Sequence, residues 1–149
     1  MKRLPADVKR VLDGRSFGHL ATLQPDGAPK VEPVWLGREG EHVLIATDQR
    51  TLKGRNMARD PRVALSIVDL ENPYEQVLIR GRVIEVRADR DLAGLDALSH
   101  KYLGRPFPRR DWPSRAIYVI EADLARYYRS PLVHPRGERE LSGGPASRG

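Results

Sequence analysis

The stretch His42-Val-Leu-Ile-Ala-Thr-Asp-Gln-Arg-Thr-Leu-Lys-Gly-Arg-Asn-Met-Ala-Arg-Asp-Pro-Arg-Val63 joins a short apolar run to a basic segment that ends at a proline. The apolar residues 43–46 are bounded by polar ones, which is typical of a buried strand. Asp48 or Thr51 can cap a following helix, and this helix must end near Asp60 because the residue before a proline is disfavoured in the α region. The stretch therefore predicts a strand, a tight turn and a helix over 51–60.

The predicted helix is strongly basic. Residues 50–62 contain five basic residues and one acidic residue, so this segment carries +4 of the chain's net charge of +6. Free N–H groups and the helix dipole favour an anion, and phosphate above all, at a helix N-terminus. Arg50, Lys53 and Asn56 share one helical face, and Gly54 leaves the first turn bare for a close approach. A phosphate site and a solvated basic helix are both consistent with these residues.

Length and composition limit the classes of protein to consider. The 149 residues suit one domain, 40% of them are hydrophobic, and the absence of cysteine excludes disulfides and zinc–sulfur sites. No apolar run is long enough for a membrane helix, and the N-terminus lacks the apolar core of an export signal, so we expect a cytoplasmic protein. Nucleic acid is not an expected partner, because only 6% of residues are aromatic and they do not alternate with basic ones.

Patterns elsewhere in the chain predict a mostly antiparallel barrel with helical insertions. Gly37-Arg-Glu-Gly40 reads as a turn, and Gly81 in a long strand indicates a bulge or bend. The barrel domain should cover residues 1–128, followed by a flexible C-terminal tail over 129–149. Six strands are predicted over residues 17–24, 29–36, 42–47, 62–69, 75–87 and 115–122, with helices over 5–13, 51–60 and 89–103.

Several familiar chemistries are absent from the sequence. There is no nucleophile elbow, no Walker loop and no glycine-rich dinucleotide loop after a strand. The four histidines are scattered without the spacing of metal ligands, so we expect no metal site. No catalytic side chain is assigned. Trp35 ends a strand near the basic helix and is as consistent with a pocket wall as with a core position.

Four segments resemble a known family in their order and spacing. They are Ala46-Thr47, Leu52-Lys53-Gly54-Arg55, Asp60-Pro61 and Gln76-Val-Leu-Ile-Arg-Gly-Arg-Val83. Together they resemble the pyridoxamine-5′-phosphate-oxidase-like split barrels over residues 5–128. Phe17-Gly-His-Leu-Ala-Thr22, Pro25-Asp-Gly-Ala-Pro29 and Lys53-Gly-Arg-Asn56 are more similar to a small branch that commonly uses the deazaflavin coenzyme F420.

This resemblance implies a six-stranded antiparallel split β-barrel that forms a homodimer, with cofactor sites at the subunit interface. The strand over Lys30–Trp35 would lie along the cofactor ring, and the start of the basic helix would hold its phosphate. The oxidase pattern has an arginine where this chain has Leu52, so Arg50 or Arg55 would have to replace it. The expected cofactor-binding residues are Lys30, Pro33, Val34, Trp35, Ala46, Thr47, Arg50, Thr51, Lys53, Asn56 and Gln76.

The function that follows from the resemblance is hydride transfer from reduced F420 to an electron-poor small molecule. The protein would bind and orient the cofactor, which carries the chemistry. The phosphate and glutamate carboxylates of F420 suit the basic helix. Two alternatives stay open, namely an FMN-dependent reductase of the same fold and a non-enzymatic protein that binds a flavin, F420 or haem. The oxidase's C-terminal substrate motif is missing, which argues against vitamin B6 synthesis.

Overall fold

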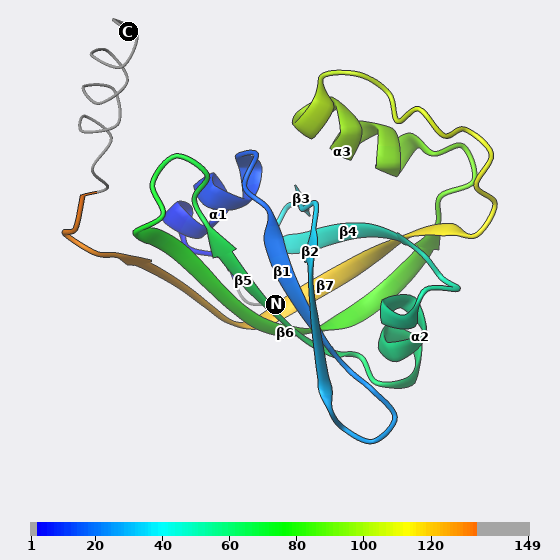
Figure 1. Cartoon of the computed structure of the whole chain (residues 1–149), viewed down its shortest axis with the longest axis horizontal. Coiled ribbons are helices and arrows are strands. Elements are labelled where there is room, and N and C mark those ends of the chain that lie inside the picture. Colours follow the sequence, from blue (N-terminus) through cyan, green and yellow to red (C-terminus); the bar gives the residue numbers. More distant parts are fainter. Residues whose placement is uncertain (1–2, 134–149) are drawn as a thin grey trace, which may run out of the picture.

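The computed structural model describes residues 3–133, which form three helices and seven strands (Figure 1). A mainly β fold was expected, and this expectation is confirmed. The helices are α1 (Ala6–Asp13), α2 (Leu52–Arg59) and α3 (Ala93–Leu103). The strands are β1 (Gly18–Leu23), β2 (Pro29–Val34), β3 (Gly37–Glu39), β4 (His42–Asp48), β5 (Arg62–Val68), β6 (Glu75–Ala88) and β7 (Arg115–Arg129).

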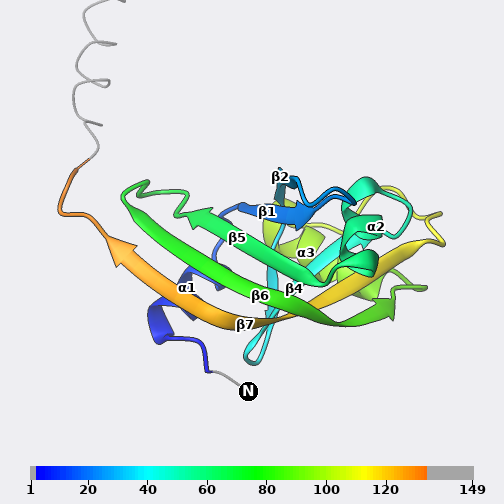
Figure 2. The ribbon, with the colours of Figure 1, turned by 90° about the horizontal axis from the view of Figure 1, so that it is seen from below.

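The strands make one curved antiparallel sheet in the order β2-β1-β5-β6-β7-β4-β3 (Figures 1 and 2). The prediction of six strands was wrong by one. Gly40 adopts a positive φ of 58°, which lets a tight turn form and leaves residues 37–39 free to pair with β4. The sheet is also not a closed barrel within residues 3–133, because β2 and β3 are its edges and do not pair with each other.

The two longest strands, β6 and β7, pair along their whole length and form the centre of the sheet. The register shifts between Arg80 and Gly81, which confirms the predicted bulge. A strand over 115–122 was predicted, but β7 continues to Arg129 because its second half pairs with the first half of β6. The domain boundary predicted at residue 128 lies at the end of this strand. Residues 134–149 of the predicted tail lie outside the residues that the structure describes.

The core packs against one face of the sheet. It contains the alternate residues of β5 and β6 that are almost completely buried, such as Leu65, Ile67 and Ile79. Burial alternates along β1, since Leu20 and Thr22 are buried while His19 is exposed. The short helix predicted over 5–13 is confirmed as α1, which adds Val8, Val11 and Leu12 to this core.

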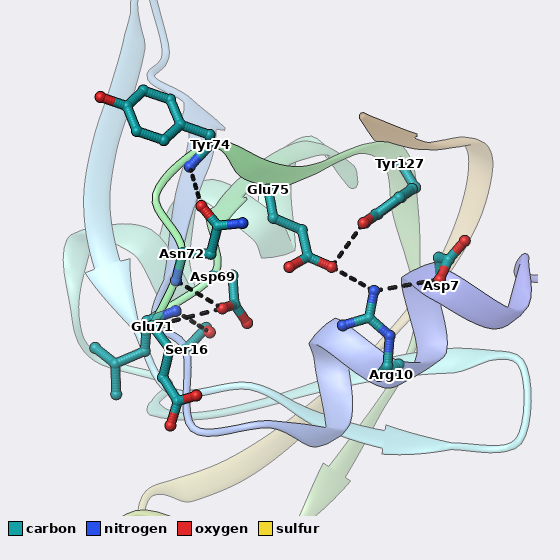
Figure 3. Close-up of polar contacts among 10 residues, drawn as sticks. Asp7, Arg10, Ser16, Asp69, Glu71, Asn72, Tyr74, Glu75 and Tyr127 are labelled. Carbon is teal, nitrogen blue, oxygen red and sulfur yellow. Dashed lines mark hydrogen bonds and ion pairs between the residues drawn. The ribbon is translucent and has the colours of Figure 1, made fainter. Parts of the chain in front are cut away.

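Polar contacts fix α1 to the sheet at the end where β6 begins (Figure 3). Glu75, only 7% exposed, accepts a hydrogen bond of 2.6 Å from the Tyr127 hydroxyl and one from the Arg10 guanidinium. These two donors, first Tyr127 and then Arg10, hold the pKa of Glu75 below its usual value. Arg10 also pairs with Asp7 on its own helix. Hydrogen bonds and ion pairs therefore hold α1 on the end of the sheet where β6 begins.

Helix α3 is tied to α1 and to the end of β2 through Lys101 and Tyr102. The Lys101 ammonium donates to the carbonyl oxygens of Leu12, at 2.6 Å, and of Leu36. The Tyr102 hydroxyl donates to Ser16 O at 2.7 Å. The predicted start of this helix at residue 89 was too early. Asp89 instead caps the helix by accepting from the N–H groups of Gly94 and Leu95.

Lys101 makes the stability of the fold depend on pH in the alkaline range. Burial lowers its pKa from 10.5 to about 8, and the charge of Asp13 opposes this only in part. Between these pH values the unfolded chain binds more protons than the folded chain, so stability conferred by Lys101 rises as pH rises. Relative to Lys101→Met, the wild type should therefore gain free energy of unfolding from about pH 8 to 10.5 in urea titrations. A difference that stays constant over this range would contradict the expectation.

Helix α2 forms close to where it was predicted. Thr51 is its N-cap and accepts a hydrogen bond of 3.1 Å from Gly54 N, while the helix ends before Asp60 and Pro61. Among the described residues, no helix combines the length and the apolar character that crossing a membrane would require.

Candidate functional site

A pocket of about 320 Å³ lies between β2, the end of β4, the start of α2 and the segment that leads from α3 into β7. The elements that enclose it come from distant parts of the sequence and meet because β4 pairs with β7. Its lining residues are Pro33, Val34, Trp35, Ala46, Thr47, Asp48, Thr51, Lys53, Leu95, Leu98, Phe107, Trp112 and Arg115.

The turn between β4 and α2 is organised by Asp48, which is 7% exposed. Its carboxylate accepts from the backbone N–H of Arg50 at 2.8 Å and from the Arg50 side chain at 3.0 and 3.2 Å. The Arg50 guanidinium, first among these partners, holds the pKa of Asp48 far below its usual value. The turn is thus fixed by a charged side chain, and the Thr51 hydroxyl, which donates to Asp48 O at 2.7 Å, completes it.

The polar end of the pocket contains two hydroxyl groups and a lysine. Thr47 and Thr51 have their hydroxyl oxygens 3.5 Å apart, and Thr47 is 3% exposed. The Lys53 ammonium lies 3.2 Å from a carboxylate oxygen of Glu32, which also lies 3.0 Å from the Lys30 ammonium. Burial works to raise the pKa of Glu32, but Lys30 and Lys53 outweigh it and lower that pKa. This end combines hydrogen-bond donors with a net positive charge.

The rest of the pocket wall is mostly apolar and includes three aromatic side chains. Trp35 stacks on Tyr102 with ring centres 5.1 Å apart and an angle of 7° between the planes. Phe107 meets the edge of Trp35 at 6.0 Å and lies 5.8 Å from Trp112. Flat, partly exposed rings of this kind suit a planar ligand. The pocket therefore offers donors at one end and planar apolar surface along its sides.

Trp112 connects the segment before β7 to the β4–α2 turn. Its indole N–H donates to Asp48 at 2.7 Å, and the guanidinium carbon of Arg115 lies 3.4 Å from its ring centre. Arg109 lies 4.0 Å from the same ring. Because Asp48 already fixes the turn, this hydrogen bond holds the aromatic wall and the polar end in one arrangement.

The structure brings together seven of the eleven expected cofactor-binding residues, and an eighth lies close by. Lys30 does not line the pocket but shares Glu32 with Lys53. The other three lie elsewhere. Arg50 is turned toward Asp48 with its side chain 71% exposed, and Gln76 is exposed on β6. Asn56 is fully buried and donates to Thr22 at 3.1 Å, so it joins α2 to β1. The seven lining residues are Pro33, Val34, Trp35, Ala46, Thr47, Thr51 and Lys53.

Gly54 has a different role from the one expected. It was thought to leave room for a phosphate, but a Cβ at this position would point at the turn and lie 2.7 Å from Asp48 O and 2.9 Å from Gln49 O. The absence of a side chain therefore allows the helix to pack closely on its own cap. The shared helical face of Arg50, Lys53 and Asn56 is likewise not used, because these three side chains have separate partners.

The pocket wall formed by α3 and the segment after it was not predicted from the sequence. Leu95, Leu98, Phe107, Trp112 and Arg115 line the pocket although they lie far from the basic helix in the sequence. A usable signal was present, because two aromatic residues among prolines and arginines in a segment without regular structure suggest a binding loop.

A substitution of Glu32 tests whether the polar end of the pocket binds an anion. Its carboxylate is charged at neutral pH and lies beside Lys53, so it opposes any anion bound there. Glu32→Gln should raise affinity for a phosphate-bearing ligand by up to about 5-fold, which corresponds to a partly exposed charge pair. Isothermal titration calorimetry measures this change directly. A loss of affinity would instead mean that the carboxylate of Glu32 itself contacts the ligand.

The fold and the pocket define a small, mainly β protein with a ligand-sized pocket, and comparison with known proteins gives its family. The sequence profile described as pyridoxamine 5′-phosphate oxidase matches residues 4–129. The chain therefore belongs to the pyridoxamine 5′-phosphate oxidase family, whose split-barrel members bind flavins and include oxidoreductases. No curated protein matches the chain.

Solved structures show the same fold. One described as an F420 reductase is 31% identical, with a TM-score of 0.76 over 83% of this chain and 98% of that one. The conserved hypothetical protein Rv2991 from Mycobacterium tuberculosis is 21% identical, with a TM-score of 0.69 over 89% and 95% of the two chains. A heme binding protein from Mycobacterium smegmatis is 22% identical, with a TM-score of 0.61 over 85% and 55%. The last two likenesses concern the fold alone.

Proposed function

We propose that this protein is an oxidoreductase that binds the reduced deazaflavin coenzyme F420 and passes a hydride to an electron-poor small molecule. The observation that carries the proposal is the pocket itself, which combines hydrogen-bond donors and Lys53 with aromatic side chains along its sides. The 31% identity to a structure described as an F420 reductase favours F420 over FMN. F420 supplies a hydride when it is bound in reduced form.

The residues present fit a ligand with a flat ring and an anionic tail. Trp35 offers a planar surface already ordered by stacking on Tyr102, so a ring placed there costs little side-chain entropy. Thr47 and Lys53 supply a hydroxyl group and an ammonium for the phosphate, while the hydroxyl hydrogen of Thr51 is engaged by Asp48 O. Phe107 and Trp112 shield the site from water. In this chain the side chains bind, orient and exclude water, and none of them is assigned a proton-transfer step.

Ligand titration tests the choice of cofactor. The absorbance of the purified protein first shows whether a chromophore is bound, and calorimetric titrations with F420, FMN and haem follow. Binding of F420 in the micromolar range without comparable binding of FMN or haem is the expected result. Tighter binding of FMN would replace the proposal by an FMN-dependent reductase, and binding of haem alone would replace it by a carrier.

A homodimer with the cofactor at its interface is part of the proposal. Val68 and Tyr128 flank Gln76 in register on the face of the sheet opposite the core, and all three are exposed. Leu78, 49% exposed, lies next along β6 on this face. Such an apolar patch suits a second copy of the chain. Since Gln76 is not among the residues that line its own pocket, it could serve a cofactor only across such an interface.

Light scattering tests this dimer. The wild type should have twice the 16.8 kDa mass of one chain, and Leu78→Glu should shift it toward the monomer because a buried unpaired charge opposes association. Leu103→Glu makes the same change at an exposed leucine at the end of α3, outside this patch, and is a matched control for the charge itself. A monomeric wild type that still binds its cofactor tightly would contradict the interface site.

A further inference from the structure

Arg115 is the first residue of β7 and lies directly opposite Asp48 in the β4–β7 register. It lines the pocket together with Thr47, Thr51 and Lys53. Only 6% of its surface is exposed, so the position is almost completely withdrawn from solvent. A charged side chain in such a place ordinarily has a carboxylate partner, because burying a lone charge is costly.

Arg115 lacks this partner within residues 3–133. Its Nε is buried without a hydrogen-bond acceptor, and no ion pair of 4.0 Å or less is formed by its guanidinium there. The two nearby carboxylates are engaged elsewhere. Asp48 accepts from Arg50 and Trp112, and Asp89 accepts from the first N–H groups of α3. They offset the charge of Arg115 through space but leave its donors unused.

The guanidinium is also held in position. Its carbon lies 3.4 Å from the centre of the Trp112 ring, and the Trp112 N–H is bonded to Asp48. Burial lowers the pKa of Arg115, yet an arginine keeps its charge at neutral pH. Stacking over a ring leaves the planar donor edge free, and this edge matches the two oxygens of a carboxylate or phosphate.

We propose that Arg115 binds an oxyanion, a phosphate or a carboxylate, of the molecule held in the pocket. This assignment deepens the proposed function and rests on it, because it concerns the same pocket. Arg115 would also supply the guanidinium that the oxidase pattern places at the position of Leu52. Arg50 is engaged by Asp48, and Arg55 is exposed and does not line the pocket, so neither meets the requirement.

The test compares Arg115→Gln with Arg55→Gln, which removes the same charge from the neighbouring helix outside the pocket. Calorimetric titrations of the full chain use F420, its phosphate-free deazariboflavin core, inorganic phosphate, benzoate and neutral benzamide. Arg115→Gln should weaken at least one oxyanion-bearing probe by roughly 10- to 150-fold, the range for hydrogen bonds to charged groups. Affinities for benzamide and for the deazariboflavin core should change by less than about 2-fold, the effect of a few tenths of a kcal/mol.

The pattern of losses identifies the source of the oxyanion. Losses for F420 and inorganic phosphate, with benzoate unchanged, assign Arg115 to the cofactor phosphate. A loss for benzoate alone assigns it to a carboxylate on the acceptor. Equal affinities of Arg115→Gln and Arg55→Gln for every oxyanion overturn the proposal. Failure of F420 to bind the wild type would overturn the proposed function, whereas the phosphate and benzoate titrations would still test Arg115.

Thermal unfolding separates binding from a structural role. Because Arg115 has no hydrogen-bond or ion-pair partner to lose and its buried charge is costly, Arg115→Gln should melt no lower than the wild type in the absence of ligand and should lose the stabilisation by phosphate or benzoate. A lower melting temperature with unchanged oxyanion affinity overturns the proposal. If Arg115→Gln does not fold, Arg115→Lys carries the test, since it keeps the charge without the planar fork. Wild-type affinity of Arg115→Lys for all oxyanions would then overturn it.

Discussion

Replacement of Lys53 by alanine is expected to weaken binding of F420 by roughly 10- to 150-fold, which corresponds to about 1.5–3 kcal/mol for a hydrogen bond to a charged group. Lys53 lines the polar end of the pocket, and its side chain is 18% exposed, so its charge is little screened by water. It stands in the first turn of α2, where backbone donors and the helix dipole also favour an anion. Calorimetric titration of Lys53→Ala and the wild type measures the loss.

The fold should be nearly unaffected by this substitution, because Glu32 retains Lys30 as its partner. Arg55→Ala is the matched control, since Arg55 lies two residues further along α2, carries the same charge and is exposed. Arg59 is a poorer control because it donates to Leu23 O and to Asn56, which hold the helix on β1. Equal losses for Lys53→Ala and Arg55→Ala would mean a diffuse basic surface in place of a phosphate site.

Gly81→Ala is expected to lower the free energy of unfolding by about 3 kcal/mol or more, at the upper end of the range for overpacking. A Cβ on residue 81 would overlap the carbonyl oxygen of Glu121 and lie 3.0 Å from its carbonyl carbon. These are backbone atoms of the paired strand β7, so they cannot rotate away as a side chain would. The two central strands would have to separate at the bulge. Urea unfolding followed by circular dichroism measures the change.

Gly14→Ala is the control for this experiment. Its Cβ would meet Val11 O at 3.4 Å, which is an ordinary contact, and its backbone is extended. It should change stability by less than about 1 kcal/mol. If Gly81→Ala were as stable as Gly14→Ala, the close approach of β6 and β7 at the bulge would be wrong.

Features set by short-range chemistry could be predicted from the sequence. The strand, cap and helix of residues 42–60 follow from an apolar run, Thr51 and Pro61, and each lies within a few residues of its cause. The bulge at Gly81 followed from a glycine inside a strand. Lys53 and Thr47 were placed in the pocket because they belong to this local unit.

Features set by pairing between distant segments could not be predicted. Nothing near Arg115 indicates that Asp48 lies opposite it, because this depends on the register of β4 and β7. The extra strand β3 and the length of β7 likewise depend on partners elsewhere in the sheet. Asn56 was assigned to the ligand from helical spacing, but the side of α2 that contains it packs on β1. Spacing identifies a shared face and does not tell what that face meets.

The position of the two tryptophans gives the molecule an optical property. The chain contains two of them, Trp35 and Trp112, and both line the pocket. Indole emission overlaps the near-ultraviolet and blue absorption of flavins and deazaflavins, so a ligand bound between these rings should quench nearly all of the protein's intrinsic fluorescence by energy transfer. Trp35→Phe and Trp112→Phe would each leave a single emitter at a known point of the wall. Occupancy of the pocket can then be followed without a label in native protein.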